Sequence, residues 1–224
     1  MDKLRPHPIE DTVEYKISWE LYEKLAPNTP YIRRQVISRM SASSVTFTQS
    51  QSFNTTKSEL TTIEGDGLRV NLFVSKCQFR CSNCFNELSQ VEGYGEPFTE
   101  KHERELFETL SLPFVDGVTF VGGEPFQSAE HLLKIAKRIR DEHPEKTIWS
   151  YTGYLVELLM LLDKTDPRRE LLSYVDVLID GQYIDEERDE SDLKMYRGSS
   201  NQRLIDVRET EKQGRTVEYI RSNE

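Results

Sequence analysis

The feature that most constrains this chain of 224 residues is a group of three cysteines, which are the only cysteines it contains. Cys77, Cys81 and Cys84 lie within eight residues and are spaced as C-x3-C-x2-C. This spacing lets one loop bring its sulfurs to three corners of a 4Fe-4S cube, whose irons take thiolate ligands. Because a fourth cysteine is missing, one iron of such a cluster would be open to a small molecule. That arrangement is typical of catalysis rather than of electron transfer alone.

Zinc is the main alternative ligand for these cysteines, since Cys3His sites are common and the chain has four histidines. Structural zinc sites, however, usually pair two ligands as C-x2-4-C and take the other two from a distant part of the chain. Three clustered cysteines without a nearby histidine fit that pattern poorly. Disulfides are less favoured still, because three is an odd number and such sparse cysteine usage is typical of a reducing compartment.

The composition predicts an acidic protein whose length suffices for one domain with a substantial core. The net charge is −10, which argues against nucleic acid or an anionic membrane as a partner. The longest apolar run, residues 155–162, is short and is interrupted by Glu157, so no segment predicts a membrane span. The first ten residues are polar and include Pro6 and Pro8, unlike a signal peptide. We therefore expect a cytoplasmic protein.

A change of composition near residue 60 predicts two parts. Of the 22 residues from 41 to 62, 15 are Ser, Thr, Asn or Gln, which is typical of an exposed polar arm. Residues 1–60 carry 8 basic and 7 acidic side chains, so the negative charge belongs to the remainder of the chain. We expect residues 1–60 to form a polar N-terminal extension of unassigned role and residues 61–224 to form the main domain.

After residue 60 the pattern alternates between apolar runs typical of strands and amphipathic segments typical of helices. Expected strands cover residues 69–74, 117–121, 147–151, 175–179 and 204–207. Expected helices follow Thr99, run from Ser128 to about Glu142, cover residues 155–162 and follow Pro167. Strands separated by helices predict an α/β fold with parallel crossovers, and nearly continuous apolar runs suit strands covered on both faces.

The residues with chemical potential all follow directly after expected strands. They are the three cysteines, Gly122-Gly123-Glu124, residues 150–153 and Asp180-Gly181. The carboxyl ends of parallel strands share one face of a barrel, where active sites gather. Four or five β/α units are too few to close a barrel of eight strands. We therefore expect an open, partial parallel β/α barrel with these residues at one mouth.

The cysteine loop resembles the signature of the radical S-adenosylmethionine enzymes, and more closely that of the glycyl-radical-enzyme activases. The pattern of those activases runs from a Gly-x-Gly and a basic residue through a Phe into the cysteines, and ends at Cys-x-Asn. In this chain the matching residues are Gly65-Asp66-Gly67, Arg69, Phe73, the three cysteines and Asn86. Lys76 stands where the family usually has Gly. Asn83 stands where many of these enzymes place an aromatic near the adenine, so Asn83 and Phe85 are both candidate cofactor contacts.

The resemblance also implies roles for the residues at the strand ends. Gly122, Gly123 and Glu124 would meet the methionine amino group of S-adenosylmethionine, whose amino nitrogen and carboxylate chelate the open iron. Ser150 and Thr152 belong to a Ser-Tyr-Thr-Gly-Tyr segment like that of the activases of anaerobic ribonucleotide reductase. Their hydroxyls either contact the ligand or cap the loop. Asp180 similarly either binds a ribose or caps the chain after its strand.

The loop of residues 197–203, Arg-Gly-Ser-Ser-Asn-Gln-Arg, is similar to a loop of the same activases. The resemblance implies a radical S-adenosylmethionine oxidoreductase. In such enzymes one electron, from a donor such as flavodoxin or ferredoxin, cleaves S-adenosylmethionine into methionine and a 5′-deoxyadenosyl radical. That radical would take a hydrogen atom from a glycine of the large subunit of anaerobic ribonucleotide reductase. The alternatives are an activase of another glycyl radical enzyme, such as pyruvate formate-lyase, and a non-catalytic iron–sulfur or zinc protein that docks to a partner.

Overall fold

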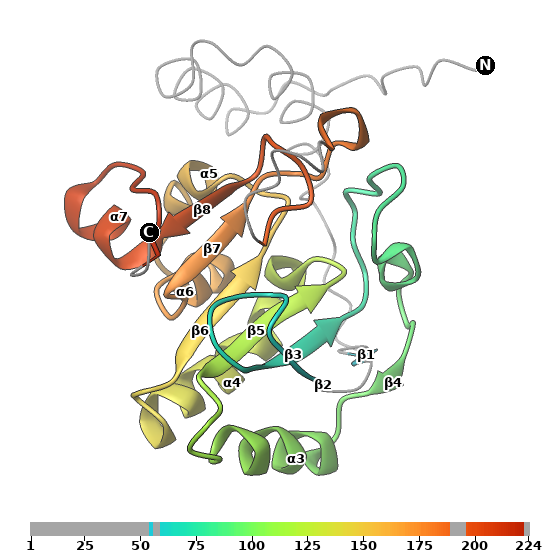
Figure 1. Cartoon of the computed structure of the whole chain (residues 1–224), viewed down its shortest axis with the longest axis vertical. Coiled ribbons are helices and arrows are strands. Elements are labelled where there is room, and N and C mark those ends of the chain that lie inside the picture. The colour runs from blue at the N-terminus through green and yellow to red at the C-terminus, as the bar shows by residue number, and fades with distance from the viewer. Residues whose placement is uncertain (1–53, 56–58, 189–195, 222–224) are drawn as a thin grey trace. The chain divides into compact units, whose positions relative to one another are not determined.

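The computed structural model describes residues 54–55, 59–188 and 196–221, which belong to one compact unit. Its centre is a six-stranded sheet with the strand order β2-β3-β5-β6-β7-β8 (Figure 1). These strands are β2 (Glu59–Thr61), β3 (Arg69–Val74), β5 (Gly117–Gly122), β6 (Thr147–Tyr151), β7 (Val177–Asp180) and β8 (Arg203–Asp206). A separate pair joins β1 (Asn54–Thr55) to β4 (Glu96–Pro97).

The four central strands are parallel and the two edge strands are antiparallel to their neighbours. Strands β3, β5, β6 and β7 pair in parallel, whereas β2 pairs antiparallel with β3 and β8 antiparallel with β7. The predicted α/β class with a mostly parallel sheet is confirmed. The sequence pattern assigned no direction to the last strand, and the structure shows β8 antiparallel to β7. Arg203 pairs directly with Asp180, because the chain turns back at the end of β7 instead of crossing to the opposite edge of the sheet.

The helices begin where local sequence signals favour them. Thr99 is the N-cap of the first of them, as predicted, and its backbone amide bonds the His102 ring. Asp166 accepts a hydrogen bond from the backbone amide of Arg168, and Pro167 supplies the first helical residue. Among the described residues the α-helices are α3 (Glu100–Leu110), α4 (Ala129–Glu142), α5 (Val156–Met160), α6 (Pro167–Leu172) and α7 (Val207–Gln213). The 3-10 helices of the same residues are η2 (Glu87–Gln90), η3 (Pro125–Ser128) and η4 (Asp185–Glu187).

The main hydrophobic core lies between one face of the sheet and the helices. It joins alternate residues of the strands to the apolar faces of the helices, among them Val70, Leu72, Phe120, Leu106, Leu132, Leu159 and Leu171. A smaller cluster on the other face contains Trp149, Val177 and Ile179, with Tyr196 and Tyr219 packed against them. The sheet is therefore covered on both faces, as the apolar runs predicted.

A buried arginine ties three strands together on the face with the smaller cluster. The guanidinium of Arg69 donates to the hydroxyls of Thr119 and Thr147, each at 2.8 Å, and to the carbonyl oxygen of Val118 at 2.8 Å. It also lies over the ring of Trp149, 5.1 Å from the centroid. Burial lowers the pKa of Arg69 to about 10, so the side chain still carries its charge at neutral pH. The basic residue of the activase-like pattern thus has a structural role here.

Within the described ranges, none of the helices has the length and apolarity that crossing a bilayer requires. The predicted polar extension, residues 1–60, lies almost entirely outside the described residues. Its boundary near residue 60 therefore stays a prediction.

Candidate functional site

The segments that follow the parallel strands meet at the carboxyl edge of the sheet (Figure 1). The loop with the cysteines follows β3, and the Gly-Gly-Glu segment follows β5. Two backbone hydrogen bonds join them directly. The amide of Gly123 donates to the carbonyl oxygen of Val74 at 2.7 Å, and the amide of Glu124 to that of Lys76 at 2.8 Å. The structure thus brings these two predicted parts of the site together.

The two glycines are required by this close approach of two backbones. Gly122 has a φ of +101°, and a Cβ atom there would lie 2.5 Å from the carbonyl oxygen of Val74. A Cβ on Gly123 would lie 2.4 Å from the carbonyl oxygen of Lys76 and 2.7 Å from that of Ser89. Real Cβ atoms do not come so close to backbone oxygens, so only glycine fits at either position.

Three residues with positive φ curl the cysteine loop. They are Lys76 at 78°, Arg80 at 46° and Asn83 at 53°, each of which lies directly before a cysteine. The left-handed region disfavours residues with a Cβ atom. Lys76 occupies the position where the resembling family usually has Gly, and its φ shows why glycine suits that position. The tight turn is therefore made here at a conformational cost.

The cysteines themselves are free thiols, each partly buried. The backbone amides of Phe79 and Arg80 are hydrogen-bonded to Cys77 and act to lower the pKa of its thiol. Burial is the larger effect and, with the nearby Glu124 carboxylate, raises that pKa to about 12. Amide donors around a sulfur are what a cluster-bound thiolate accepts from its protein. The donor set of this loop therefore fits an iron–sulfur cluster.

A site for a single metal ion is not formed by the described residues. None of their His, Cys, Asp and Glu side chains gather in a group of three or more that could hold one ion. Structural zinc needs four such ligands around a single centre. A 4Fe-4S cube instead spreads its thiolates over separate irons, so its three cysteines need not converge on one point.

Glu124 links the ends of β5 and β6. Its buried carboxylate accepts hydrogen bonds from the hydroxyl of Thr152 at 2.8 Å, the amide of Gly153 at 2.8 Å and the amide of Phe126 at 3.0 Å. Burial raises the pKa of Glu124 to about 7, against the lowering effect of these three donors. The sequence treated Glu124 and Thr152 as separate ligand contacts, whereas the structure bonds them to each other.

Ser150 and Asp180 are both fully buried. The hydroxyl of Ser150 donates to the carbonyl oxygen of Tyr151 at 3.1 Å. The carboxylate of Asp180 accepts from the amide of Val156, at the start of α5, at 2.8 Å. Thr152 shows the expected capping of its loop, since it also accepts from the amide of Tyr154 at 3.1 Å, whereas Asp180 bonds the start of α5 and not the chain after its own strand. A ligand contact by any of the three residues stays a prediction.

Asn83 and Phe85 carry the cysteine loop towards the segment after β7. The Asn83 amide donates to the carboxylate of Asp185, and the Phe85 ring packs edge-to-face on Tyr183 with centroids 5.5 Å apart. Arg188 lies over the same ring, 4.8 Å from its centroid. The cysteine loop therefore also adjoins the segment that follows β7. An adenine contact by Asn83 or Phe85 stays a prediction.

Sequence reasoning missed the role of Arg203. Because β8 runs antiparallel, its first residue lies at the carboxyl edge, where the Arg203 guanidinium bonds Asp180 at 2.9 Å and Glu157 at 2.8 and 3.0 Å. The loop before it clamps the segment after β7, since Gln202 donates to the carbonyl oxygen of Gly181 and Ser199 accepts from the amide of Ile184. The Arg-Gly-Ser-Ser-Asn-Gln-Arg loop was the available signal for a role of Arg203. The structure shows that this second arginine of the loop pairs with carboxylates of its own chain.

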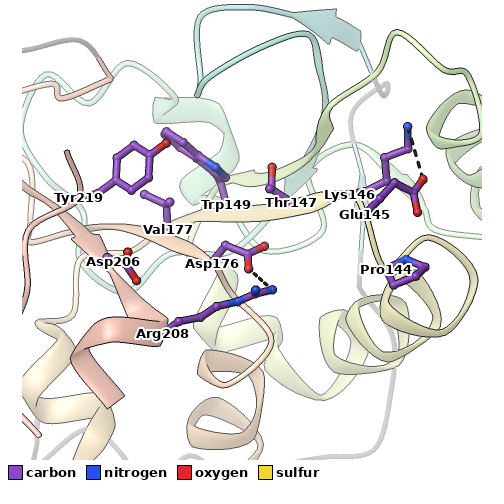
Figure 2. Close-up of a pocket in the computed structure, with 10 residues that line it drawn as sticks. All are labelled: Pro144, Glu145, Lys146, Thr147, Trp149, Asp176, Val177, Asp206, Arg208 and Tyr219. Atoms are coloured by element: carbon purple, nitrogen blue, oxygen red, sulfur yellow. Dashed lines mark ion pairs between the residues drawn. The ribbon is translucent and has the colours of Figure 1, made fainter. Parts of the chain in front are cut away.

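A hollow of about 270 Å³ lies at the opposite edge of the sheet (Figure 2). It is lined by the beginnings of β6 and β7 and the end of β8, with Trp149 and Tyr219 on one side. The carboxylate of Asp176 pairs there with Arg208 and, at 2.6 Å, with Arg140 of α4, and accepts from the amide of Ile148 at 2.7 Å. This hollow is separate from the cysteine site, and its charged groups already serve the fold.

Comparison with known proteins identifies a matching family model and several similar proteins. A family model described as a 4Fe-4S single cluster domain matches residues 63–205. The anaerobic ribonucleoside-triphosphate reductase-activating protein of Enterobacteria phage T4 is 38% identical over 144 residues, which is 63% of this chain and 86% of that protein. The protein of the same name from Pasteurella multocida (strain Pm70) is 38% identical over 146 residues, 62% of this chain and 88% of the relative. The protein of the same name from Escherichia coli (strain K12) is 33% identical over 144 residues, which is 62% of this chain and 89% of the relative. The 63–205 match includes every candidate site residue.

Proposed function

Because this chain belongs to the family of anaerobic ribonucleoside-triphosphate reductase-activating proteins, we propose that it generates the glycyl radical of an anaerobic ribonucleotide reductase by cleaving S-adenosylmethionine. The large subunit of that reductase is then its macromolecular substrate. The observation that carries the proposal is the C-x3-C-x2-C loop bonded through its backbone to the Gly-Gly-Glu turn of β5.

Cys77, Cys81 and Cys84 would hold a 4Fe-4S cluster, and the iron without a thiolate would bind S-adenosylmethionine. When bound, such a cluster would supply the single electron that reductive cleavage of S-adenosylmethionine to methionine requires, and the 5′-deoxyadenosyl fragment would leave as 5′-deoxyadenosine with the hydrogen atom of the glycine. The cofactors supply this chemistry and the protein supplies binding and orientation. The electron comes from an external one-electron donor of the flavodoxin or ferredoxin type.

The residues of the chain hold the ligands in place. Gly122, Gly123 and Glu124 stand next to the cysteine loop and are the proposed contacts of the methionine amino group. The Glu124 carboxylate already accepts three hydrogen bonds, and this supports a role in fixing the turn. Asn83 and Phe85 remain our candidates for contact with the adenine. Ser150, Thr152 and Asp180 are buried and would support the residues that contact the ligand.

The mostly parallel sheet with its site at the carboxyl edge supports an open, partial β/α barrel of the radical S-adenosylmethionine type. We also place the protein in the cytoplasm, because three free cysteines are typical of a reducing compartment. The net charge of −10 supports a protein partner rather than nucleic acid or an anionic membrane surface.

Anaerobic reconstitution with iron and sulfide tests the function. We expect about four irons per chain, release of 5′-deoxyadenosine that depends on a reductant, and a glycyl EPR doublet on the added reductase subunit. Changing each cysteine in turn to alanine should abolish product, whereas Ser82→Ala, an exposed position of the same loop, should retain it. Bound zinc with no deoxyadenosine from the wild-type protein would refute the proposal. A doublet on pyruvate formate-lyase but not on the reductase would refute the choice of substrate.

A further inference from the structure

Four large apolar side chains are exposed on the ten residues that follow the third cysteine. The exposed fractions are 64% for Phe85, 62% for Leu88, 59% for Val91 and 37% for Tyr94. The described part of the chain exposes ten large apolar side chains in all, so this one segment carries four of them. We call residues 85–94 the apolar ridge. Single exposed apolar residues are ordinary, but a concentration of them marks an interaction surface.

The exposure of the side chains separates an outer side of the ridge from an inner one. The ridge includes the 3-10 helix η2, Glu87–Gln90, which ends at Val91, where the backbone is extended. Amides bond carbonyl oxygens three residues earlier at Ser89, Val91 and Tyr94, with N–O distances of 3.0, 3.2 and 3.3 Å, so the backbone after Val91 turns again. Leu88, Val91 and Tyr94 are exposed, whereas Ser89 between them is buried. The ridge therefore has an apolar outer side and an inner side that packs on the protein.

The inner side fixes the ridge to the cysteine loop. The amide of Cys77 donates to the carbonyl oxygen of Gln90 at 3.2 Å, and the side chain of Gln90 donates to the carbonyl oxygen of Cys81 at 3.3 Å. The carbonyl oxygen of Ser89 lies against Gly123, where a Cβ atom would come within 2.7 Å of it. A molecule bound to the ridge is therefore held in a fixed position relative to the three cysteines.

We propose that the apolar ridge is the docking surface for the glycine-bearing surface of the reductase, an inference that rests on the proposed function. Hydrogen-atom transfer requires the reacting atoms to approach to about 3–3.5 Å and water to be excluded. The reductase must therefore contact the rim of the cysteine site, and the ridge begins at the residue after Cys84. The exposed carboxylate of Glu87 has no ion-pair partner among the described residues. The reductase surface that fits is apolar, with a basic group opposite Glu87.

The test compares two double variants of the reconstituted full-length chain. Leu88→Ser with Val91→Ser removes the centre of the ridge without touching Phe85, a candidate cofactor contact. Phe114→Ser with Leu161→Ser is the matched control, since these apolar side chains are exposed elsewhere, at 57% and 44%. Affinity for the large reductase subunit is measured by anaerobic biolayer interferometry, and 5′-deoxyadenosine release with dithionite is measured without reductase.

For the ridge variant we expect a Kd for the reductase raised at least tenfold, with deoxyadenosine release within twofold of the wild type. The glycyl doublet should return to its wild-type intensity when the concentration of the ridge variant is raised in proportion to its higher Kd. The control variant should match the wild type in all three measurements. Equal affinity of both variants for the reductase would overturn the inference while leaving the proposed function intact. If the wild-type protein yields neither 5′-deoxyadenosine nor the glycyl doublet, the proposed function itself is refuted.

Two other occupants of the ridge would give different results, and either would overturn the inference. If the ridge joins two copies of this chain, sedimentation shows a wild-type dimer that the ridge variant loses while its affinity for the reductase is unchanged. If the ridge receives the electron donor, the ridge variant is reduced normally by dithionite but not by flavodoxin, again with unchanged affinity for the reductase.

Discussion

Replacing Arg203 by methionine tests whether buried ion pairs hold the carboxyl edge of the sheet together. The guanidinium of Arg203 bonds two carboxylates from different elements, Asp180 at the end of β7 and Glu157 in α5. Asp180 is completely buried, and its other oxygen accepts from the amide that begins α5. Methionine keeps much of the apolar volume of the side chain but leaves both carboxylates without their cation.

The expected loss in the free energy of unfolding is about 3 kcal/mol at pH 8. Removing one partner of a buried pair costs roughly 3–5 kcal/mol, because an uncompensated charge remains in the interior. We take the lower end of that range, since the Arg203 side chain is 30% exposed and solvent screens part of its interaction. Arg208→Met is the matched control. The Arg208 side chain, which pairs with Asp176, is 69% exposed, so this variant should lose less than about 1 kcal/mol in the free energy of unfolding.

The loss should also depend on pH. Burial raises the pKa of the Asp180 carboxyl, against the lowering effect of Arg203, so ionised Asp180 lowers the stability as pH rises through its folded-state pKa. Burial acts to raise the pKa of Glu157 as well, but its bonds to Arg203 and Thr216 bring it below its usual value. Without Arg203 the pKa of each carboxyl is higher in the folded protein. The difference between wild type and variant therefore shrinks as pH falls towards about 4.

Urea unfolding of the anaerobically reconstituted proteins, followed by circular dichroism at pH 5 and pH 8, measures these differences. Asp180→Asn added to Arg203→Met should restore part of the lost stability at pH 8, because the double variant no longer buries that charge. A loss below 1 kcal/mol, or one that does not change between the two pH values, would show that the pairing does not stabilise the edge.

Three further substitutions test the other contacts. Gly123→Ala should lower the iron content after reconstitution several-fold, because its Cβ would lie 2.4 Å from the carbonyl oxygen of Lys76. Ser82→Ala, at an exposed position of the cysteine loop, should not lower it, and equal iron contents of the two variants would contradict this. Lys76→Gly should raise the free energy of unfolding by up to about 1 kcal/mol in urea, since relief of the positive φ outweighs an exposed ion pair with Glu92. A lower stability would refute it. Asp176→Ala should lower the free energy of unfolding by about 3 kcal/mol in the same assay, because Arg140, Arg208 and the amide of Ile148 each lose a hydrogen-bond acceptor. A loss below about 1 kcal/mol would refute that.

The sequence predicted the central strands well, because their apolar runs are long and are interrupted by clear helix signals. Thr99 and Pro167 mark helix starts in the structure as they do in the sequence. The meeting of the cysteine loop with Gly122-Gly123 also followed from the order of the strands, since parallel ends share one edge. These features depend on local patterns and on one topological rule.

Other features depend on contacts between distant residues, which local patterns do not contain. The antiparallel direction of β8 depends on how the chain returns after Asp180, and four apolar or charged residues in a row, Arg203–Asp206, fit either direction. The partners of Asp180 could not be foreseen, because the pattern placed Arg203 in a polar loop whose position relative to β7 it does not specify. The bonds from Thr152 and Gly153 to the Glu124 carboxylate could not be foreseen either, since nothing local indicates them, and the ligand role of Glu124 stays a prediction.

The backbone bonds from Gly123 and Glu124 to Val74 and Lys76 have a consequence for damage to the cysteine loop. They tie the start of the cysteine loop to the segment that follows β5, so a backbone shift at either place is passed to the other. Oxidation or substitution at Cys77 that moves the start of the loop would therefore disturb the Gly-Gly-Glu turn as well.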